Sequence, residues 1–580
     1  MLHLIIGKAG TGKTAAIIEK IRGAVQRCES GHMLIVPEQY SHEAERELCE
    51  KCGDTMSLYA EVFSFTGLAR RVRSQCGGGA AEYLDKGGRL LCMSLALGSV
   101  GSRLRVYGAA ERKSELQAML LSAIDELKTA CIGADVLTEA AQECGGALGE
   151  KLYDLALIYE AYEAVAANGH ADPADMLTLL AGQIPESTIG KDTHVYIDGF
   201  IDFTAQEQNV IAALLDAGAE VTVCLTVDSM DGDNEIFEMS RRAGRALIAA
   251  AKESGAEYSI ELSEKEWSKD ASLGYYGDML FSYTSGRYEG KAAISLQYAE
   301  SVTAECEFAA AKALELVRDG GCRWRDIAVA VRGFDDYRGI LANVFEQYGV
   351  PLFISARSEL MYKPLPLMIS LAYEICAKGW DVDDVISYMH TGLTGLDEEE
   401  SEFLEGYIFK WQLRSSAWMR EEDWKQHPDG YRGEYDDEAL ERLAAINAAR
   451  RRLALPLLEF QRASAQAQTA EEQCAALAGL FADIKLPEQL EKRALLLADA
   501  GREELAQEYA QLWDIVVSAL EQTAAILTDR QMDRDEFGRL FTLMLSKYDV
   551  GTIPVSLDRV SAGDFDRMRR RSIKHLIVLG

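Results

Sequence analysis

Short apolar runs alternate along this chain with longer segments in which apolar residues recur at helical spacing. Short strands separated by helices are typical of βαβ units, which build parallel sheets. Five runs lie before residue 230 and the last two flank a long helical tract, so we predict an α/β protein with two lobes. The runs predicted to be strands are Leu2–Ile6, Met33–Val36, Val62–Phe65, Val195–Ile197, Val221–Val227, Ile327–Val331 and Leu576–Leu579.

Each lobe is predicted to carry a helical insertion. Proline breaks helix interiors and central strands, and none occurs between Pro37 and Pro173, a stretch with amphipathic runs such as 115–121. A second helical tract contains only three prolines, at 428, 456 and 487. We therefore predict residues 1–80 and 171–285 as the first lobe and 81–170 as its insertion, then 286–370 and 549–580 as the second lobe and 371–548 as its insertion.

Composition and charge narrow the classes of protein. Apolar residues make up 48% of the chain, yet no window approaches the roughly 18 apolar residues of a membrane span, and the first residues lack the charged start of a signal peptide. We expect a cytoplasmic protein with no membrane contact. The net charge of −33 would repel nucleic acid, so any such role needs local basic groups. Candidates are Arg70-Arg71-x-Arg73, Arg450–Arg452 and the cluster from Arg567 to Lys574.

The most specific chemical signal is Gly7-Lys8-Ala9-Gly10-Thr11-Gly12-Lys13-Thr14, which follows the first predicted strand and precedes a helical run. This is the phosphate-loop pattern in the strand–loop–helix context that it needs. Glycines allow backbone N–H groups to converge on a phosphate at a helix N-terminus. We expect Lys13 to neutralise the β- and γ-phosphates of ATP and Thr14 to offer its hydroxyl to Mg²⁺.

A second group needed for phosphate chemistry, a carboxylate, is predicted at the end of another strand. Asp198 ends the run His194–Ile197 and is the candidate ligand for Mg²⁺. The next residue is Gly199, which has no carboxylate to orient water, and losing a positioned base costs roughly 10²–10⁴ in rate. Asp202 could replace that base, but it lies four residues further on. ATP binding is therefore well supported and fast hydrolysis is not.

These segments resemble the opening of superfamily 1 helicases of the UvrD and RecB type. The resemblance rests on Gly7–Thr14, Ile35–Ser41, Glu61–Arg70 and Asp198–Phe203. It implies two RecA-like phosphate-loop lobes, with single-stranded DNA contacted by residues of the second, third and fourth segments. The implied DNA contacts are Gln39, Tyr40, Ser41, Ser64, Phe65, Arg70 and Phe203, although core packing or a solvated loop would explain each one alone.

The chain is more closely similar to the B-subunit family of the bacterial AddAB helicase-nucleases. Thr391–Leu393, Tyr407–Trp411 with Trp418, and Ile553–Val560 continuing to Leu576–Gly580 carry this resemblance. It implies a heterodimer with an A-type motor subunit that processes duplex DNA ends for recombinational repair. In such a heterodimer this chain would scan the single strand for a recombination hotspot (Chi-like) sequence.

The departures from the active motors imply a helicase scaffold without an efficient motor. Gly199 replaces a Glu, Leu225–Met230 replaces a GDxxQ motif, and Asp558–Ser561 replaces a turn rich in His and Lys. Relatives continue into a nuclease domain with a four-cysteine iron–sulfur cluster, whereas no cysteine follows Cys474 here. We therefore expect the exonuclease and the cluster to belong to a part that this sequence lacks. The alternatives are an active superfamily 1 ATP-dependent DNA helicase or translocase, and a small-molecule phosphotransferase.

Overall fold

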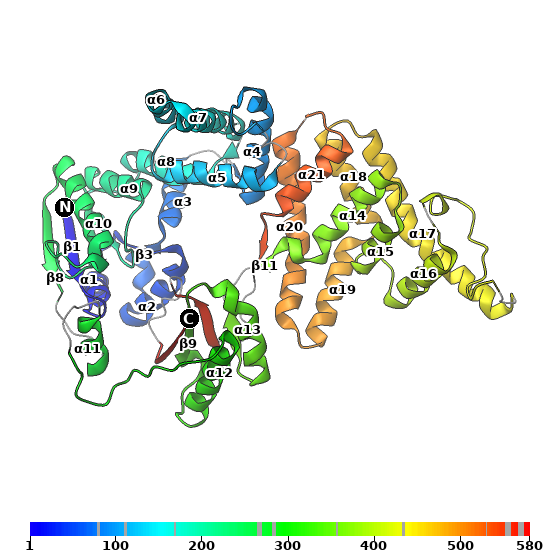
Figure 1. Ribbon diagram of the computed structural model, residues 1–580. Coiled ribbons are helices and arrows are strands. Elements are labelled where there is room, and N and C mark those ends of the chain that lie inside the picture. Colours follow the sequence, from blue (N-terminus) through cyan, green and yellow to red (C-terminus); the bar gives the residue numbers. More distant parts are fainter. Residues whose placement is uncertain are drawn as a thin grey trace. The chain divides into compact units, whose positions relative to one another are not determined.

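The computed structural model describes residues 1–77, 82–108, 113–167, 170–263, 270–280, 286–354, 358–413, 415–431, 435–528, 530–551, 558–565 and 573–580 (Figure 1). The chain forms two compact units. The first comprises Met1–Tyr83, Arg103–Gly108 and Met119–Tyr298, and the second comprises Leu84–Ser102, Ala109–Ala118 and Ala299–Gly580. No helix in the described ranges is both long enough and apolar enough to cross a bilayer.

The first unit is built on a six-stranded parallel sheet with strand order β3-β2-β6-β7-β1-β8. Successive side chains of a strand point to opposite faces, so both faces of this apolar sheet need a cover. Leu4 and Ile6 of β1 join one core, and Ile5 between them joins the other. The strands are β1 (Leu2–Gly7), β2 (His32–Ile35), β3 (Ala60–Phe63), β6 (His194–Ile197), β7 (Glu220–Thr226) and β8 (Tyr258–Leu262).

Helices cover the two faces of this sheet separately. Helices α1 (Lys13–Gln26) and α2 (Ser41–Cys52) supply one core, with Ile17, Ile21 and Leu48 fully buried. The opposite core is supplied by α3 (Phe65–Cys76), α8 (Met176–Gln183), α9 (Ala205–Asp216) and α10 (Glu238–Glu253). Helix α11 (Ala271–Met279) follows β8.

Between α3 and α8 the chain is mainly helical, with α4 (Lys86–Val100), α5 (Ser114–Thr129), α6 (Ala134–Cys144) and α7 (Gly146–Ala166), and with the short paired strands β4 (Glu82–Tyr83) and β5 (His170–Ala171). Lys128 of α5 links this helix to α7 and to the segment before α8. Its buried ammonium lies 2.9 Å from Asp172 and 2.8 Å from Asp175, and also contacts Glu163 of α7. Burial alone would lower the pKa of Lys128, but the three carboxylates outweigh burial and raise it. Lys128 therefore already supplies the cation for this acidic group.

The second unit contains a four-stranded parallel sheet with order β10-β13-β9-β14. Its strands are β9 (Ile327–Val331), β10 (Leu352–Ile354), β13 (Val560–Asp564) and β14 (His575–Leu579). Helices α12 (Val302–Arg318) and α13 (Phe334–Gln347) pack on it around Cys306, Leu341 and Phe345.

A large helical region follows in the second unit. It comprises α14 (Pro364–Lys378), α15 (Val382–His390), α16 (Glu398–Trp411), α17 (Asp437–Gln466), α18 (Ala470–Asp483), α19 (Leu486–Asp499), α20 (Glu503–Leu527) and α21 (Arg534–Leu545), with the short antiparallel pair β11 (Ser358–Glu359) and β12 (Asp549–Val550). These helices share a core that includes Trp380, Trp418 and Phe460. Helix α4 packs against α20 and α21 in the same unit.

All seven predicted strands are present, and the predicted α/β class with parallel sheets is confirmed. The domain boundaries drawn from the sequence stay a prediction. Of the basic clusters considered as nucleic-acid contacts, Arg450–Arg452 makes contacts within the protein itself. The buried Arg450 guanidinium donates to the carbonyls of Glu422 and Arg420, while Arg451 and Arg452 pair with Asp423 and Glu400. Residues 566–572 of the last cluster lie outside the described residues.

Candidate nucleotide site

The phosphate loop joins β1 to α1 at the carboxyl edge of the six-stranded sheet. Gly12 precedes the helix at φ 83°, a left-handed conformation that favours glycine, and no side chain caps the first turn. The N–H groups of that turn are therefore left for a ligand. There is also no acidic residue in the first turn of α1, so no carboxylate of the helix itself competes with a phosphate for the positive end of the helix dipole.

Lys13 is folded back into this loop. Its side chain is 8% exposed, and its ammonium donates to the carbonyl oxygens of Gly7 and Lys8, each at 2.7 Å. Burial lowers the pKa of Lys13, and the nearby Cys224 and Asp198 partly oppose that effect. Lowering the pKa means that the charged form is costly here, and a phosphate would supply the missing counter-charge.

Thr14 and Asp198 meet although 184 positions separate them. The Thr14 hydroxyl donates to a carboxylate oxygen of Asp198 at 2.6 Å. Asp198 directly follows β6, which is separated from β1 by β7 in the sheet. A hydroxyl and a carboxylate are oxygen ligands of the kind that Mg²⁺ prefers. The residues present therefore fit a Mg²⁺-bound nucleotide: Lys13 and the helix N-terminus for phosphates, Thr14 and Asp198 for the metal.

Gly199 has a backbone conformation that explains the missing carboxylate. Its φ is 89°, and a Cβ added there would lie 3.3 Å from Cδ of Pro37, which lies two residues after the end of β2. A residue with a side chain would be strained at this φ. Asp202 is held by other groups, because its carboxylate accepts from the Phe203 backbone at 2.8 Å and pairs with Arg242 at 3.2 Å.

Two residues that sequence analysis missed hold the loop from outside. The Lys8 ammonium lies 2.7 Å from the Asp278 carboxylate of α11, and the Ser263 hydroxyl donates to the Thr11 carbonyl at 2.5 Å. Both partners lie more than 250 positions away along the chain. No local pattern marks them, because neither belongs to a motif.

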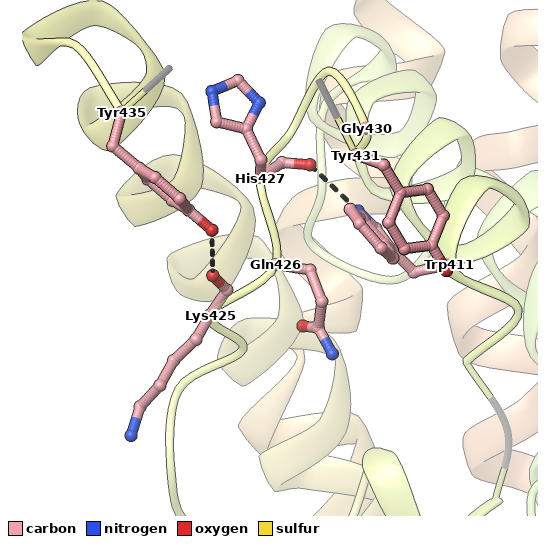
Figure 2. A pocket seen from close by; sticks show the side chains of 7 residues that line it. All are labelled: Trp411, Lys425, Gln426, His427, Gly430, Tyr431 and Tyr435. Carbon is pink, nitrogen blue, oxygen red and sulfur yellow. Dashed lines mark hydrogen bonds between the residues drawn. The ribbon is translucent and has the colours of Figure 1, made fainter. Parts of the chain in front are cut away.

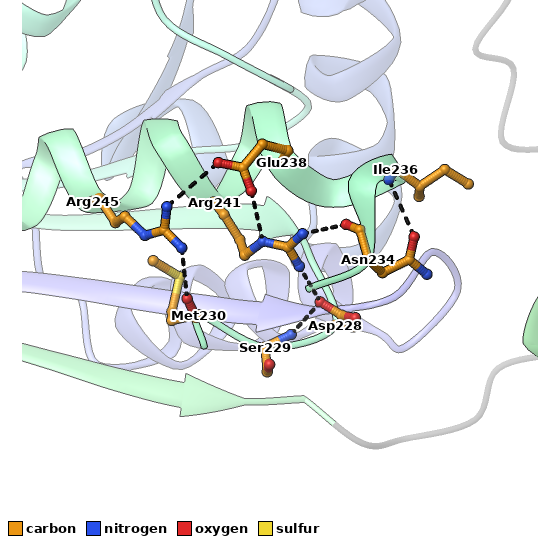
Figure 3. A network of polar contacts seen from close by, with 8 residues as sticks. All are labelled: Asp228, Ser229, Met230, Asn234, Ile236, Glu238, Arg241 and Arg245. Atoms are coloured by element: carbon orange, nitrogen blue, oxygen red, sulfur yellow. Dashed lines mark hydrogen bonds and ion pairs between the residues drawn. The ribbon is translucent and has the colours of Figure 1, made fainter. Parts of the chain in front are cut away.

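The turn after β7 is fixed by a buried arginine. Arg241 of α10 is 0% exposed and donates to Asp228 at 3.0 Å, to Glu238 at 3.3 Å and to the carbonyl of Asn234. Figure 3 shows these groups converging on the guanidinium. This turn carries the residues that replace the GDxxQ motif, and Asp228 is committed here to an internal ion pair.

The residues predicted to contact DNA differ in how exposed they are. Gln39 and Arg70 are exposed, and Tyr40 and Ser41, which follow Gln39 in the chain, are partly buried. Ser64 caps α3 by accepting from the Gly67 N–H at 3.0 Å. Phe65 and Phe203 are each 4% exposed, and both contact Phe200: Phe65 edge-on with the ring centroids 5.4 Å apart, and Phe203 stacked with the centroids 5.3 Å apart. Packing accounts for these two rings in the structure, and their DNA contact stays a prediction.

The structure is therefore that of an α/β protein whose parallel sheet carries a glycine-rich loop, a buried lysine and a hydroxyl–carboxylate pair at its carboxyl edge. Residues 4–275 match the family model described as ADDB, N-terminal. These residues belong to the AddB family.

Curated relatives match the chain over its whole length. Each is the B subunit of an ATP-dependent helicase/deoxyribonuclease. The chain is 31% identical to that of Acetivibrio thermocellus and 33% identical to that of Desulforudis audaxviator, and both matches cover 100% of this chain and 52% of the relative. The relative from Clostridium acetobutylicum is 27% identical, with 100% and 51% covered. The chain thus spans about half the length of the curated relatives it matches.

Proposed function

We propose that this chain is the helicase-like part of a helicase–nuclease subunit, and that it binds ATP and Mg²⁺ while hydrolysing ATP slowly. The observation that carries the proposal is the pair formed by Asp198 and Gly199. Asp198 accepts from Thr14 at 2.6 Å, as a metal-side carboxylate should, whereas Gly199 at φ 89° offers no carboxylate and has no room for one without strain.

In this proposal each residue of the loop has a role. The N–H groups of Gly7–Thr14 and the Lys13 ammonium hold the phosphates, and Thr14 with Asp198 holds Mg²⁺. Bound Mg²⁺ would neutralise phosphate charge. With no base beside Asp198, the attacking water is not oriented, so the nucleotide is held and only slowly consumed.

The DNA role is supported by the names of the relatives and by the exposed residues of the strand-contacting segments. We infer that the two parallel sheets are RecA-like lobes and that the first unit contacts single-stranded DNA through Gln39, Tyr40, Ser41, Ser64, Phe65, Arg70 and Phe203. An A-type motor subunit would drive the strand, and this chain would scan it for a hotspot sequence during repair of duplex ends in the cytoplasm. We assign neither nuclease activity nor an iron–sulfur cluster to any described residue.

The test is to measure ATP binding and ATP turnover on the same purified chain. We expect Mg²⁺-dependent ATP binding, and turnover of about 0.1 per second or slower with or without single-stranded DNA, since the median enzyme turns over at about 10 per second and lack of a base costs roughly 10²–10⁴. DNA-stimulated turnover of many per second would overturn the proposal in favour of an active translocase. Absence of ATP binding would remove the nucleotide site itself.

A further inference from the structure

An aromatic pocket lies in the helical region of the second unit, far along the chain from the phosphate loop. It has a volume of about 410 Å³, within the range of small-molecule sites, roughly 300–1,000 Å³. It lies between the end of α16 and the segment that leads to α17 (Figure 2). The residues that line it are Trp411, Lys425, Gln426, His427, Gly430, Tyr431 and Tyr435.

The walls of this pocket are held in place from behind. The Trp411 indole N–H donates to the His427 carbonyl at 3.0 Å, and the Tyr435 hydroxyl donates to the Lys425 carbonyl at 2.8 Å. Tyr407, stacked on Trp424 in the core, donates to the Gln426 carbonyl at 2.9 Å. These bonds fix the backbone of residues 425–427, so this part of the segment needs no ordering on binding.

Two of the rings are exposed. Tyr431 is 90% exposed, and its ring stands edge-on to Trp411 with the centroids 4.5 Å apart. Tyr435 is 55% exposed, and its ring centroid lies 4.9 Å from that of the buried His427. Exposed aromatic faces beside a cavity are suited to stack a planar ligand, and stacking on such faces is how proteins hold unpaired bases.

The charge of the pocket is opposite to that of the whole chain. The chain carries a net charge of −33, but the described lining residues include Lys425 and no carboxylate. The neighbouring Asp429 is paired with Arg442 at 2.6 Å. In the described part of the chain Lys425 forms no ion pair. Figure 2 shows Trp411 and Tyr431 on one side of Gln426 and Lys425 on the other. Ring faces, an amide and an ammonium in this order match a base joined to a phosphate.

We propose that this pocket binds one nucleotide unit, with the base against Tyr431 and Trp411, its edge near Gln426 and a phosphate at Lys425. Single-stranded DNA and free nucleotides share this chemistry. Of these two ligands, the proposed function favours single-stranded DNA. Only this choice between the ligands rests on the proposed function. The pocket would be a second point of contact for the strand, outside the segments predicted from sequence.

The experiment uses oligothymidylate carrying one 5-iodouracil for photo-cross-linking, with fluorescence anisotropy to measure affinity. We expect a cross-link in the peptide that contains Trp411 or Tyr431. Tyr431→Ala and Lys425→Ala should each weaken oligonucleotide binding roughly five- to tenfold, as expected for loss of one stacked base or one phosphate contact. Tyr431→Phe, which keeps the ring, should retain affinity.

Matched controls come from the same unit. Tyr362 is 82% exposed and Lys492 is exposed on α19, so Tyr362→Ala and Lys492→Ala remove the same groups elsewhere and should change nothing. Tyr431 is so exposed that its replacement leaves the core intact. Affinity unchanged in Tyr431→Ala and Lys425→Ala, with no cross-link in the pocket, would overturn the proposal.

A second experiment distinguishes binding of single-stranded DNA from binding of free nucleotides. It also tests the pocket separately from the proposed function. If the chain binds no oligonucleotide at all, the proposed function fails, and the pocket is then tested with thymidine monophosphate in a Lys13→Ala background. Binding of the mononucleotide that Tyr431→Ala abolishes would support the pocket, whereas no binding would overturn it.

Discussion

The two parallel sheets each contain a strand that runs into a helix through a glycine in the left-handed conformation, yet only one of these turns is a candidate phosphate site. Gly12 before α1 has φ 83°, and Gly333 before α13 has φ 73°. Neither helix has a side-chain cap. Both therefore present N–H groups and a positive dipole end to whatever lies at the strand edge.

The difference lies in the residues around the glycine. Five residues, Lys8 to Gly12, separate β1 from α1, and Lys13 follows at once, whereas only Arg332 and Gly333 separate β9 from α13. The first turn of α13 also holds Asp335 and Asp336, while that of α1 has no acidic residue. These two carboxylates already satisfy the helix dipole and would repel a phosphate. The comparison shows that a strand–turn–helix unit provides donors, and that loop length and charge decide whether they bind an anion.

The largest expected effect separates these two turns directly. Lys13→Ala should weaken ATP–Mg²⁺ binding roughly 10- to 150-fold, because a charge-assisted bond to a buried phosphate is lost. Arg332→Ala removes an exposed cation from the turn before α13 in the second sheet and should leave affinity unchanged. Isothermal titration of both variants measures this. Equal loss in the two variants would mean that general charge, and not the loop, binds the nucleotide.

A smaller effect is expected at Gly199, where the site departs from the active motors. Gly199→Glu should lower stability by about 1–3 kcal/mol, because a side chain at φ 89° is strained, and should not produce fast ATP turnover. Gly199→Ala is the matched control, since it carries the same strain without the carboxylate. Thermal unfolding and turnover are measured on both. A large gain in turnover in Gly199→Glu alone would show that one carboxylate was the whole deficit.

The smallest effect concerns the outer contact of the loop. Asp278→Asn should tighten ATP binding about two- to fivefold, because Lys8 is released and a negative charge is removed, and exposed ion pairs are worth about 1 kcal/mol at most. The control is Asp216→Asn at the end of α9, which removes an exposed carboxylate of the same unit. The affinity of both variants for ATP is measured at low and at high salt. Weaker binding in Asp278→Asn would mean that Asp278 supports the loop instead of competing with phosphate.

The sequence predicts those strands of the two parallel sheets that are continuous apolar runs. It misses β8, whose residues are all exposed, β10, which is only three residues long, and β13, which is buried but contains Ser561, Gly563 and Asp564. Exposed or small-residue strands lack the apolar signal from which a strand is predicted. The burial of Phe65 and Phe203 was not predictable either. The sequence around an aromatic residue does not reveal whether its ring lies at the surface or in the core.

The chain's own order of residues determined the phosphate loop, because all of its donors lie within Gly7–Thr14 and depend on a backbone path that local glycines allow. It also determined that no acid directly follows Asp198. Only the tertiary structure decided that Thr14 meets Asp198, that Pro37 closes the space over Gly199 and that Asp278 holds Lys8. These contacts join residues that are far apart in the chain, and their distances depend on strand order and packing, which no local pattern encodes.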